Sequence, residues 1–342
     1  MASPSTEWKE TVPAGEATAF EGYAEALREM QRRAAVGGGK PGRALHAKGF
    51  GATASFTVLP DLPAHARQGL FATPATYRAY VRYSNGNGTP QADGKPDVRG
   101  VAIKVIGVAG KKIIPGLENA KTQDFLLIRT PSLPFRDAHE FVKVITAASN
   151  PLLLLPRVLG RLGLRRTLGL LPRLAKSVGA PISSVATTPY YSAAAVQCGD
   201  YAVRIALVSQ ATDASAKPGT SPDYLAEELA ARLRRGPVVY DVRLQFYVDD
   251  ARTPIEDFSV EWLAADAPPL TVARLTVPQQ DTASPRGRRV AEYIEQLSFD
   301  PWHALEAHRP LGNVMRARNT AYRLSTQERA AAAEPDVGDG FD

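Results

Sequence analysis

Apolar and polar residues alternate with a period of two in several short segments, and this pattern predicts β-strands. The clearest segment is residues 238–248. There the apolar residues Val242, Leu244, Phe246 and Val248 alternate with a second set: Asp241, Arg243, Gln245 and Tyr247. Such alternation is typical of an antiparallel sheet with one face on a core and the other toward water. Six further apolar segments bounded by turn residues are also predicted strands: residues 55–59, 79–83, 101–106, 125–129, 202–208 and 270–277.

Other segments repeat their apolar residues at helical spacing. The best marked is residues 221–236, where Ser221 can cap the first turn, Pro222 suits that turn, and Gly236 ends the helix. Strands mixed with helices predict an α+β fold built on a closed barrel. The other predicted helices are residues 21–35, 290–296 and about 313–322.

The polar and charged ends of the chain differ from its middle. We expect residues 1–20 to be a loose N-terminal arm, residues 21–330 a single domain, and residues 331–342 a disordered acidic tail.

Within the domain, residues 150–178 form a basic, leucine-rich insertion. Its stretch 151–176 favours a broken pair of amphipathic helices packed on the barrel. The alternative is a lid or a membrane-surface patch that makes peripheral contact with lipid and admits apolar substrates.

Composition narrows the class of protein. The 342 residues are 44% hydrophobic and 22% charged, which is typical of a globular protein with a sizeable core. The net charge of +6 comes from scattered arginines without a groove-reading motif, so we do not expect nucleic-acid binding. One cysteine, Cys198, excludes an intrachain disulfide and favours a reducing compartment. With no secretory signal pattern at the start, we expect a cytoplasmic protein.

Four motifs appear in order along the chain. They are RALHAKGF at residues 43–50, RYSNG at 82–86, PDVRGVAIK at 96–104 and RNTAYRLSTQER at 318–329. Together they resemble the haem catalase superfamily, specifically its short catalase-like branch. The resemblance covers residues 43–329 and implies an eight-stranded antiparallel barrel with helices packed outside. It also implies a non-covalently bound haem b (iron protoporphyrin IX).

The last motif carries an arginine and a tyrosine four residues apart, so Arg318 and Tyr322 share one face of a helix. A phenol ordinarily keeps its proton to about pH 10, but a guanidinium and ferric iron both favour the phenolate. An isolated pair of this kind is more often a surface contact. The resemblance implies that Tyr322 ligates the haem iron, with Arg318 beside it in the cofactor site.

The resemblance places His46 and Ser84 on the distal side of the haem. Imidazole titrates near the working pH and can move the proton of a peroxide, while the serine orients the ring. Catalases add an asparagine five residues before a phenylalanine pair, but here Leu126 and Leu127 replace that pair. The asparagine position falls on Lys121 or Thr122, and a small shift offers Asn119 or Gln123. The catalytic candidates are therefore His46, Ser84, Thr122 and Gln123.

The haem propionates need cationic partners when they are buried. By position, Arg43, Arg82 and Arg329 match the propionate-binding arginines of the family. Phe135 lies one residue from the place of the aromatic ring that stacks on the porphyrin.

These motifs predict a haem-dependent peroxidase that reduces organic hydroperoxides and hydrogen peroxide with a small-molecule electron donor, and that has weak catalase activity. Two alternatives stay open: rearrangement of a fatty-acid hydroperoxide, and non-catalytic haem binding. His46 and Ser84 argue against mere haem storage, which needs no proton transfer. A homodimer also stays open.

Overall fold

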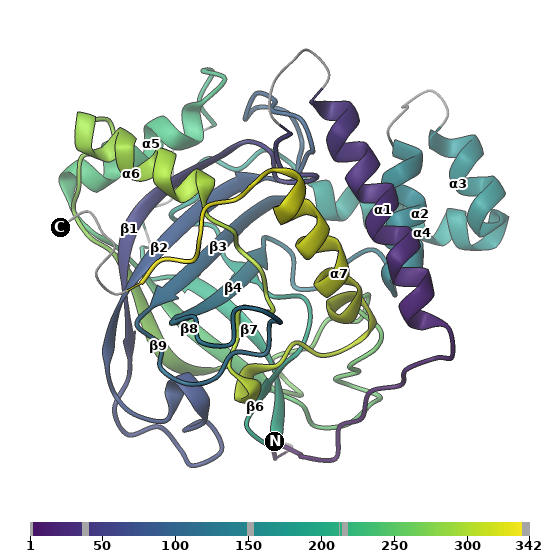
Figure 1. Ribbon diagram of the computed structural model, residues 1–342, viewed down its shortest axis with the longest axis horizontal. Helices are drawn as coiled ribbons and strands as arrows, with labels where there is room; N and C mark the ends of the chain where they lie inside the picture. The colour runs from purple at the N-terminus through teal and green to yellow at the C-terminus, as the bar shows by residue number, and fades with distance from the viewer. Residues whose placement is uncertain (1–2, 36–40, 149–153, 212, 214–217, 337–342) are drawn as a thin grey trace.

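Nine strands of the computed structural model form one antiparallel sheet that closes into a barrel (Figure 1). The structure describes residues 3–35, 41–148, 154–211, 213 and 218–336. The strand order is β5-β4-β3-β2-β1-β9-β8-β7-β6, and β5 also pairs with β7. Eight strands therefore complete the ring, and β6 is added at the edge of β7. The strands are β1 Gly49–Val58, β2 Thr76–Asn85, β3 Arg99–Ile106, β4 Thr122–Ile128, β5 Tyr190–Tyr191, β6 Val196–Cys198, β7 Tyr201–Ser209, β8 Val238–Phe246 and β9 Leu270–Val277.

Seven α-helices among the described residues surround the barrel, so the predicted α+β class and eight-stranded barrel are confirmed. In Figure 1, α6 lies across β1 and β2, while α1 and α7 lie side by side with α2 to α4 beyond them. The helices are α1 Glu16–Ala34, α2 Ala138–Ala148, α3 Leu154–Leu162, α4 Leu164–Val178, α5 Tyr224–Arg235, α6 Pro285–Gln296 and α7 Asn313–Glu328.

Strict alternation builds the barrel core. In β8, every second residue from Val238 to Phe246 is buried, as the sequence pattern predicts. Aromatic rings fill the interior, and the rings of Phe56 and Phe125 stack with centroids 5.8 Å apart. Because successive side chains of a strand point to opposite faces, the neighbours of these core residues lie on the outer face of the barrel.

Several predicted element boundaries are corrected by the structure. Strand β1 begins at Gly49, six residues earlier than predicted, because its small residues pair with β2 although they carry little hydrophobic signal. Helix α5 begins at Tyr224, and Ser221 does not cap it; its hydroxyl instead donates to a Glu227 carboxylate oxygen at 2.7 Å.

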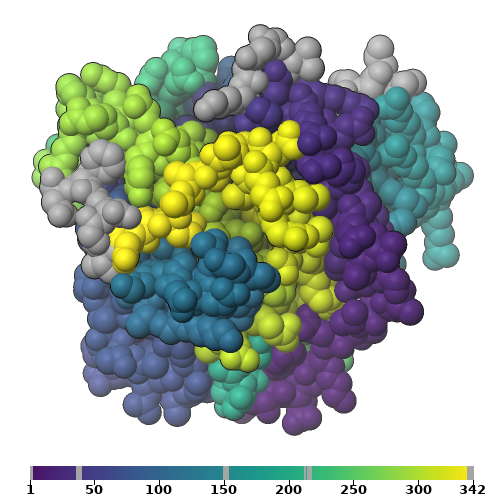
Figure 2. Space-filling view, viewed as in Figure 1, coloured from purple at the N-terminus to yellow at the C-terminus, as the bar shows by residue number. Residues whose placement is uncertain are grey.

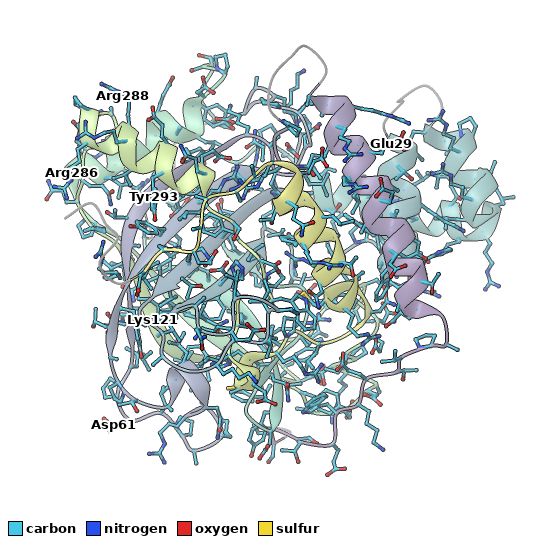
Figure 3. The ribbon with its side chains drawn as sticks, in the orientation of Figure 1. Glu29, Asp61, Lys121, Arg286, Arg288 and Tyr293 are labelled. Atoms are coloured by element: carbon cyan, nitrogen blue, oxygen red, sulfur yellow. The ribbon has the colours of Figure 1, made fainter. Side chains whose placement is uncertain are left out.

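Helix α6 also begins earlier than predicted, because the Ser284 hydroxyl accepts from the Gly287 N–H and caps it. In Figure 3, Arg286 and Arg288 lie at the outer rim of this helix. Its Tyr293 ring packs edge-on against Tyr80 of β2, with centroids 5.6 Å apart.

The N-terminal segment is attached to the body rather than loose. The Ser5 N–H donates to Tyr247 O at 2.9 Å, and the Trp8 indole donates to Asp200 O at 2.8 Å. Glu10 pairs with Arg309 and Arg316, both at 2.7 Å. Polar composition alone suggested an arm, but its partners lie at distant positions in the sequence.

The insertion forms two helices, α3 and α4, that pack against α2 and not directly on the barrel as expected. Val158 and Leu170 are buried there with Val144 and Ala147. Residues 150–153 of the insertion lie outside the described residues. No helix within the described ranges has the length and apolar character needed to cross a membrane.

The start of the expected acidic tail is ordered by a buried ion pair. The Glu334 carboxylate accepts from Lys104 Nζ and Thr122 Oγ1, each at 2.7 Å, and from Ser298 Oγ at 2.8 Å. The Lys104 ammonium, fully buried, also donates to Asp124 at 2.8 Å. The tail prediction therefore fails for this part, while residues 337–342 lie outside the described residues.

This ion pair predicts an acid-sensitive step in stability. Although burial opposes it, Lys104 and its neighbours lower the pKa of Glu334 from 4.5 to about 2. A lowered carboxyl pKa stabilises the folded state above the unfolded pKa, and that contribution is lost as the pH falls from about 5 toward 2. Shifting the pKa by that much corresponds to about 3 kcal/mol. Denaturant unfolding should show Glu334→Gln less stable than wild type at pH 7, with the gap closing toward pH 2. A gap that is the same at both pH values would contradict the assignment.

Candidate haem site

The distal part of the candidate site lies where the segment before β1 meets β2 and β3. His46 Nδ1 lies 2.9 Å from Ser84 Oγ, and the His46 N–H donates to Gly86 O at 3.0 Å. His46 itself has a positive φ of 58°, a conformation that is uncommon outside glycine. A Cβ atom at Gly100 would come within 2.9 Å of His46 Cε1, so glycine there leaves room for the ring.

The imidazole of His46 is held neutral. Its pKa is lowered to about 3, first by burial and then by the cations Arg82, Arg318 and Arg43. The residue as a whole is half-buried. In a neutral imidazole one nitrogen donates and the other accepts. If Nδ1–H donates to Ser84 Oγ, the Nε2 lone pair is available to accept a proton.

The proximal part of the candidate site lies on α7. Arg318 Nη2 donates to Tyr322 Oη at 2.6 Å, and the guanidinium carbon lies 4.8 Å from the centre of the tyrosine ring. Helix α7 is fixed by α1, since Gln31 Nε2 donates to Ser325 O at 3.2 Å and Arg32 pairs with Glu328 at 2.7 Å. The four-residue spacing thus places guanidinium and phenol together, as the sequence predicts.

Three arginines gather at the C-terminal end of α6. Arg82 makes a bidentate ion pair with Glu295 at 2.8 and 2.9 Å, and its side chain is only 3% exposed. Arg43 donates to Glu295 O at 3.1 Å and to Leu297 O at 2.9 Å, while Arg329 donates to Leu297 O at 2.6 Å. Burial and the neighbouring charges of Arg82 and Arg329 hold the pKa of Arg43 well below its ordinary value.

The three parts meet at one place in the molecule. Arg318 is close enough to lower the pKa of His46, and Tyr322 is close enough to affect that of Arg43. The outer face of the barrel carries Ser84 and Arg82, since Tyr83 between them points into the core. Helix α7 packs mainly on α1 and α2, so Tyr322 is presented from outside the barrel.

These residues fit a haem. Four guanidinium groups, those of Arg43, Arg82, Arg318 and Arg329, have Glu295 as their one ion-paired carboxylate among the described residues. Arg82 is buried and the other three are half-buried. Such an excess of positive charge favours an anionic ligand, and the two haem propionates would supply it. Tyr322 would supply the oxygen ligand that haem iron accepts from tyrosine.

Three sequence-predicted residues are not brought to this place. Thr122 and Gln123 lie six and five residues from Ile128, the residue of β4 that pairs with Gly100 beside His46. At about 3.3 Å per residue, that separates them from the His46 end of the sheet by roughly 16 to 20 Å. Thr122 donates to Glu334, and Gln123 Oε1 accepts from the Leu305 N–H at 2.9 Å.

Phe135 is the third. It is buried against α2, α3 and α4, and its ring meets Phe141 edge-on with centroids 5.4 Å apart. Phe135 therefore packs on side chains of α2, α3 and α4, which does not agree with the predicted role of stacking on a porphyrin.

Glu295 and Gly100 are the residues that the sequence reasoning missed. The four motifs contain more arginines than carboxylates, which was the one sign that a carboxylate lies near them. This excess does not show where in the sequence that carboxylate lies. Gly100 was contained in the DVRG motif, but its effect on His46 requires the pairing of β2 with β3.

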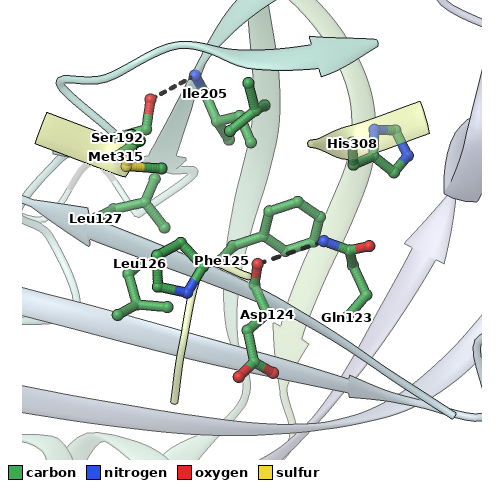
Figure 4. A pocket seen from close by; sticks show the side chains of 11 residues that line it. Gln123, Asp124, Phe125, Leu126, Leu127, Ser192, Ile205, His308 and Met315 are labelled. Carbon is green, nitrogen blue, oxygen red and sulfur yellow. Dashed lines mark hydrogen bonds between the residues drawn. The ribbon is translucent and has the colours of Figure 1, made fainter. Parts of the chain in front are cut away.

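A cavity of about 20 Å³ lies among residues of β4, β7 and α7 (Figure 4). Gln123, Phe125, Leu127, His308 and Met315 are among the residues that line it. It has room for about one water molecule, and neither His46 nor Tyr322 lines it. We therefore do not assign the chemistry to this cavity.

Comparisons with known proteins agree with this geometry. A sequence model of the catalase family matches residues 31–151. A catalase-related peroxidase of Mycolicibacterium paratuberculosis is 32% identical over 321 residues, which cover 88% of this chain and 95% of that protein.

The fold is that of solved catalases. A bacterial catalase superposes with a TM-score of 0.67 at 19% identity, covering 96% of this chain and 63% of its own. Catalase A from Saccharomyces cerevisiae gives 0.66 at 16% identity, covering 97% and 68%. The chain thus spans about two-thirds of the length of these catalases.

The fold and these matches define a peroxidase- or catalase-like oxidoreductase. The chain belongs to the catalase family, which suggests a haem cofactor, and it is similar over nearly all of its length to a catalase-related peroxidase.

Proposed function

We propose that this chain is a haem b-dependent peroxidase that reduces hydrogen peroxide and organic hydroperoxides at the expense of a small-molecule electron donor, with weak catalase activity. The observation that carries the proposal is the neutral His46, bonded to Ser84, in the same charged cluster as the Arg318–Tyr322 pair. When bound, haem supplies an iron centre that exchanges electrons with peroxide and donor.

The residues of the chain would transfer the proton, ligate the iron and bind the propionates. His46 accepts the proton of the hydroperoxide O–H and returns it to the departing oxygen, while Ser84 fixes the plane of the ring. Tyr322 would supply an oxygen ligand to the iron, and Arg318, which donates to its hydroxyl, would hold that oxygen in place. Arg43, Arg82 and Arg329 would bind the propionates.

A donor-oxidation assay on purified holoprotein tests this function. Oxidation of a phenolic donor should exceed oxygen release with hydrogen peroxide. Product analysis with a lipid hydroperoxide separates reduction to the alcohol, which we expect, from rearrangement. Oxygen release that outpaces donor oxidation would instead make the protein an ordinary catalase.

Leu126 supports the preference for organic hydroperoxides. It lies on the outer face of β4, opposite Ala102 and in the row that contains Arg82, and it remains partly exposed. Leu127 points into the barrel core. Leu126 thus gives the outer face of the sheet an apolar side chain in the same row as Arg82, and apolar contact favours an alkyl or aryl hydroperoxide.

We expect Leu126→Phe to lower the second-order rate with cumene hydroperoxide about tenfold and to leave the rate with hydrogen peroxide nearly unchanged. The added ring takes space that a bulky substrate needs, whereas hydrogen peroxide needs little. The ratio of the two rates serves as an internal control for haem content. An unchanged ratio would remove Leu126 from the substrate path.

The ion pairs of Glu295 affect how tightly the apoprotein is expected to bind haem. Its carboxylate occupies Arg82 and lies 3.7 Å from Arg43 Nε, so it competes with a propionate for these cations. Glu295→Gln should tighten haem binding about tenfold, or about 1.4 kcal/mol. Haem transfer to a scavenger protein measures this directly. Glu292→Gln, an exposed position on the same helix, is the matched control and should behave as wild type. Weaker binding by the Glu295 variant would show that the carboxylate helps to hold the haem.

We also propose a reducing, cytoplasmic location. Cys198 is a free, buried thiol whose pKa is raised to about 12 by burial. It has no cysteine partner in the sequence, so an oxidising compartment would offer the fold no disulfide.

A further inference from the structure

Helices α3 and α4 carry an unusual set of exposed leucines. Eight large hydrophobic side chains are strongly exposed among the described residues, and five of them lie on these two helices. They are Leu155 (54% exposed), Leu159 (39%), Leu164 (64%), Leu168 (60%) and Leu171 (42%). Their spacing of three or four residues places the leucines of each helix along one side of that helix.

This side differs from the one that packs on the protein. In α4 the buried positions are Thr167, Leu170 and Ser177, which form their own stripe. The exposed leucines are therefore a second apolar stripe, and no described part of the chain covers it. Exposed apolar residues gathered on one element mark a contact with a partner or a membrane.

The same helices are basic throughout. Residues 154–178 contain six basic residues and no acidic residue. Arg166 pairs with Glu140, and Arg161 donates to Lys143 O and Thr146 Oγ1. The other four have no ion-pair partner within the described parts of the chain: Arg157, Arg165, Arg173 and Lys176.

We propose that the exposed leucine face of α3 and α4 docks on the surface of an anionic phospholipid bilayer. The leucines would enter the acyl boundary, and Arg165 and Lys176, which flank the leucine stripe of α4, would meet lipid phosphates. Arg157 and Arg173 lie on the opposite sides of their helices and would add attraction over the distance of a helix diameter. Figure 2 shows these helices as a lobe at the edge of the molecule, beyond α1, where a flat surface can reach them. The positive charge of α3 and α4 complements the negative charge of the bilayer.

A second copy of the chain fits this face less well. Two identical faces in contact would bring at least eight uncompensated cations together, counting the four from each copy. The bilayer also suits a peroxidase that accepts apolar hydroperoxides, although the docking proposal does not depend on that substrate.

Co-sedimentation of the full-chain holoprotein with vesicles tests the proposal. The vesicles contain phosphatidylglycerol mixed with phosphatidylcholine, or phosphatidylcholine alone, each at low and at high salt. Wild type should bind the anionic vesicles at low salt, at least tenfold more strongly than the neutral ones, and should be released by salt. Leu164→Ser/Leu168→Ser should weaken binding at least fivefold, because it removes the two most exposed leucines. Arg165→Gln/Arg173→Gln/Lys176→Gln should weaken it at least tenfold.

The matched control is Arg67→Gln/Arg235→Gln/Arg289→Gln, which removes the same charge at exposed positions elsewhere. It should bind within about twofold of wild type. Haem content and circular dichroism verify that each variant is folded.

Three outcomes would overturn the proposal. They are no binding to anionic vesicles at low salt, equal losses in the two charge variants, and full binding by the leucine variant. Sedimentation velocity that shows a dimer dissociated by the leucine substitutions would instead make this face a contact between copies.

Discussion

Tyr322→Phe is expected to lose most of its haem, or to bind the remainder with a changed ferric spectrum. The hydroxyl accepts from Arg318 at 2.6 Å, and in the proposed site its oxygen would ligate the iron. Phenylalanine keeps the ring and its packing on α7 but removes the oxygen. Reconstitution of the apoprotein with haem, read as haem per protein and as the ferric absorption spectrum, measures the effect.

Tyr23→Phe is the control for this variant. Its hydroxyl lies 2.7 Å from His139 Nδ1, so the substitution also removes one hydrogen bond from a helix, but outside the candidate site. It should keep wild-type haem content and spectrum. A Tyr322→Phe protein with both unchanged would contradict the ligand assignment and leave the arginine cluster in need of another anion.

The parts of the site that the sequence predicted are those set by local geometry. Arg318 and Tyr322 meet because a helix turns once in 3.6 residues, so the four-residue spacing of RxxxY is enough to predict their contact. His46 and Ser84 are 38 residues apart, and their 2.9 Å contact needs the hairpin of β1 and β2. The contact between these two residues was predicted from the family motif, because the periodicity of a sequence does not show which distant residues come together.

The parts that failed depend on register or on distant partners. Thr122 was chosen by counting back from a leucine pair, but sheet pairing with Ile106 places it at the far end of β4 from Ile128. Glu334 looked like part of a polar tail because Lys104, its buried partner, lies 230 residues away. Long-range partners of this kind leave no trace in local composition.

The charge balance connects the fold to the proposed chemistry. The barrel face and the ends of α6 and α7 bring together arginines that would repel one another without an anion. Glu295 neutralises part of that charge and shares Arg82 with the carbonyl of His46. The same group that would bind a propionate therefore also fixes the backbone of the distal histidine.

His46→Ala is expected to keep its haem and to lose peroxide reactivity by a factor of about 10² to 10⁴, the usual contribution of a positioned acid–base group. The imidazole neither ligates the iron nor binds a propionate in the proposed site, so haem content should stay at the wild-type value. Stopped-flow mixing with hydrogen peroxide and with cumene hydroperoxide measures the second-order rates. Both should fall, because each peroxide must give up and regain a proton.

The pH profile and two further variants make this assignment specific. With its pKa near 3, His46 stays neutral above about pH 4, so the wild-type rate should be flat from pH 8 to pH 5. Ser84→Ala frees the ring and should cost about tenfold, while His139→Ala, bonded to Tyr23 outside the site, should react as wild type. A wild-type rate that falls below pH 7 would show that an ordinary, solvated histidine is at work. Equal losses in the His46 and His139 variants would assign the proton transfer to neither.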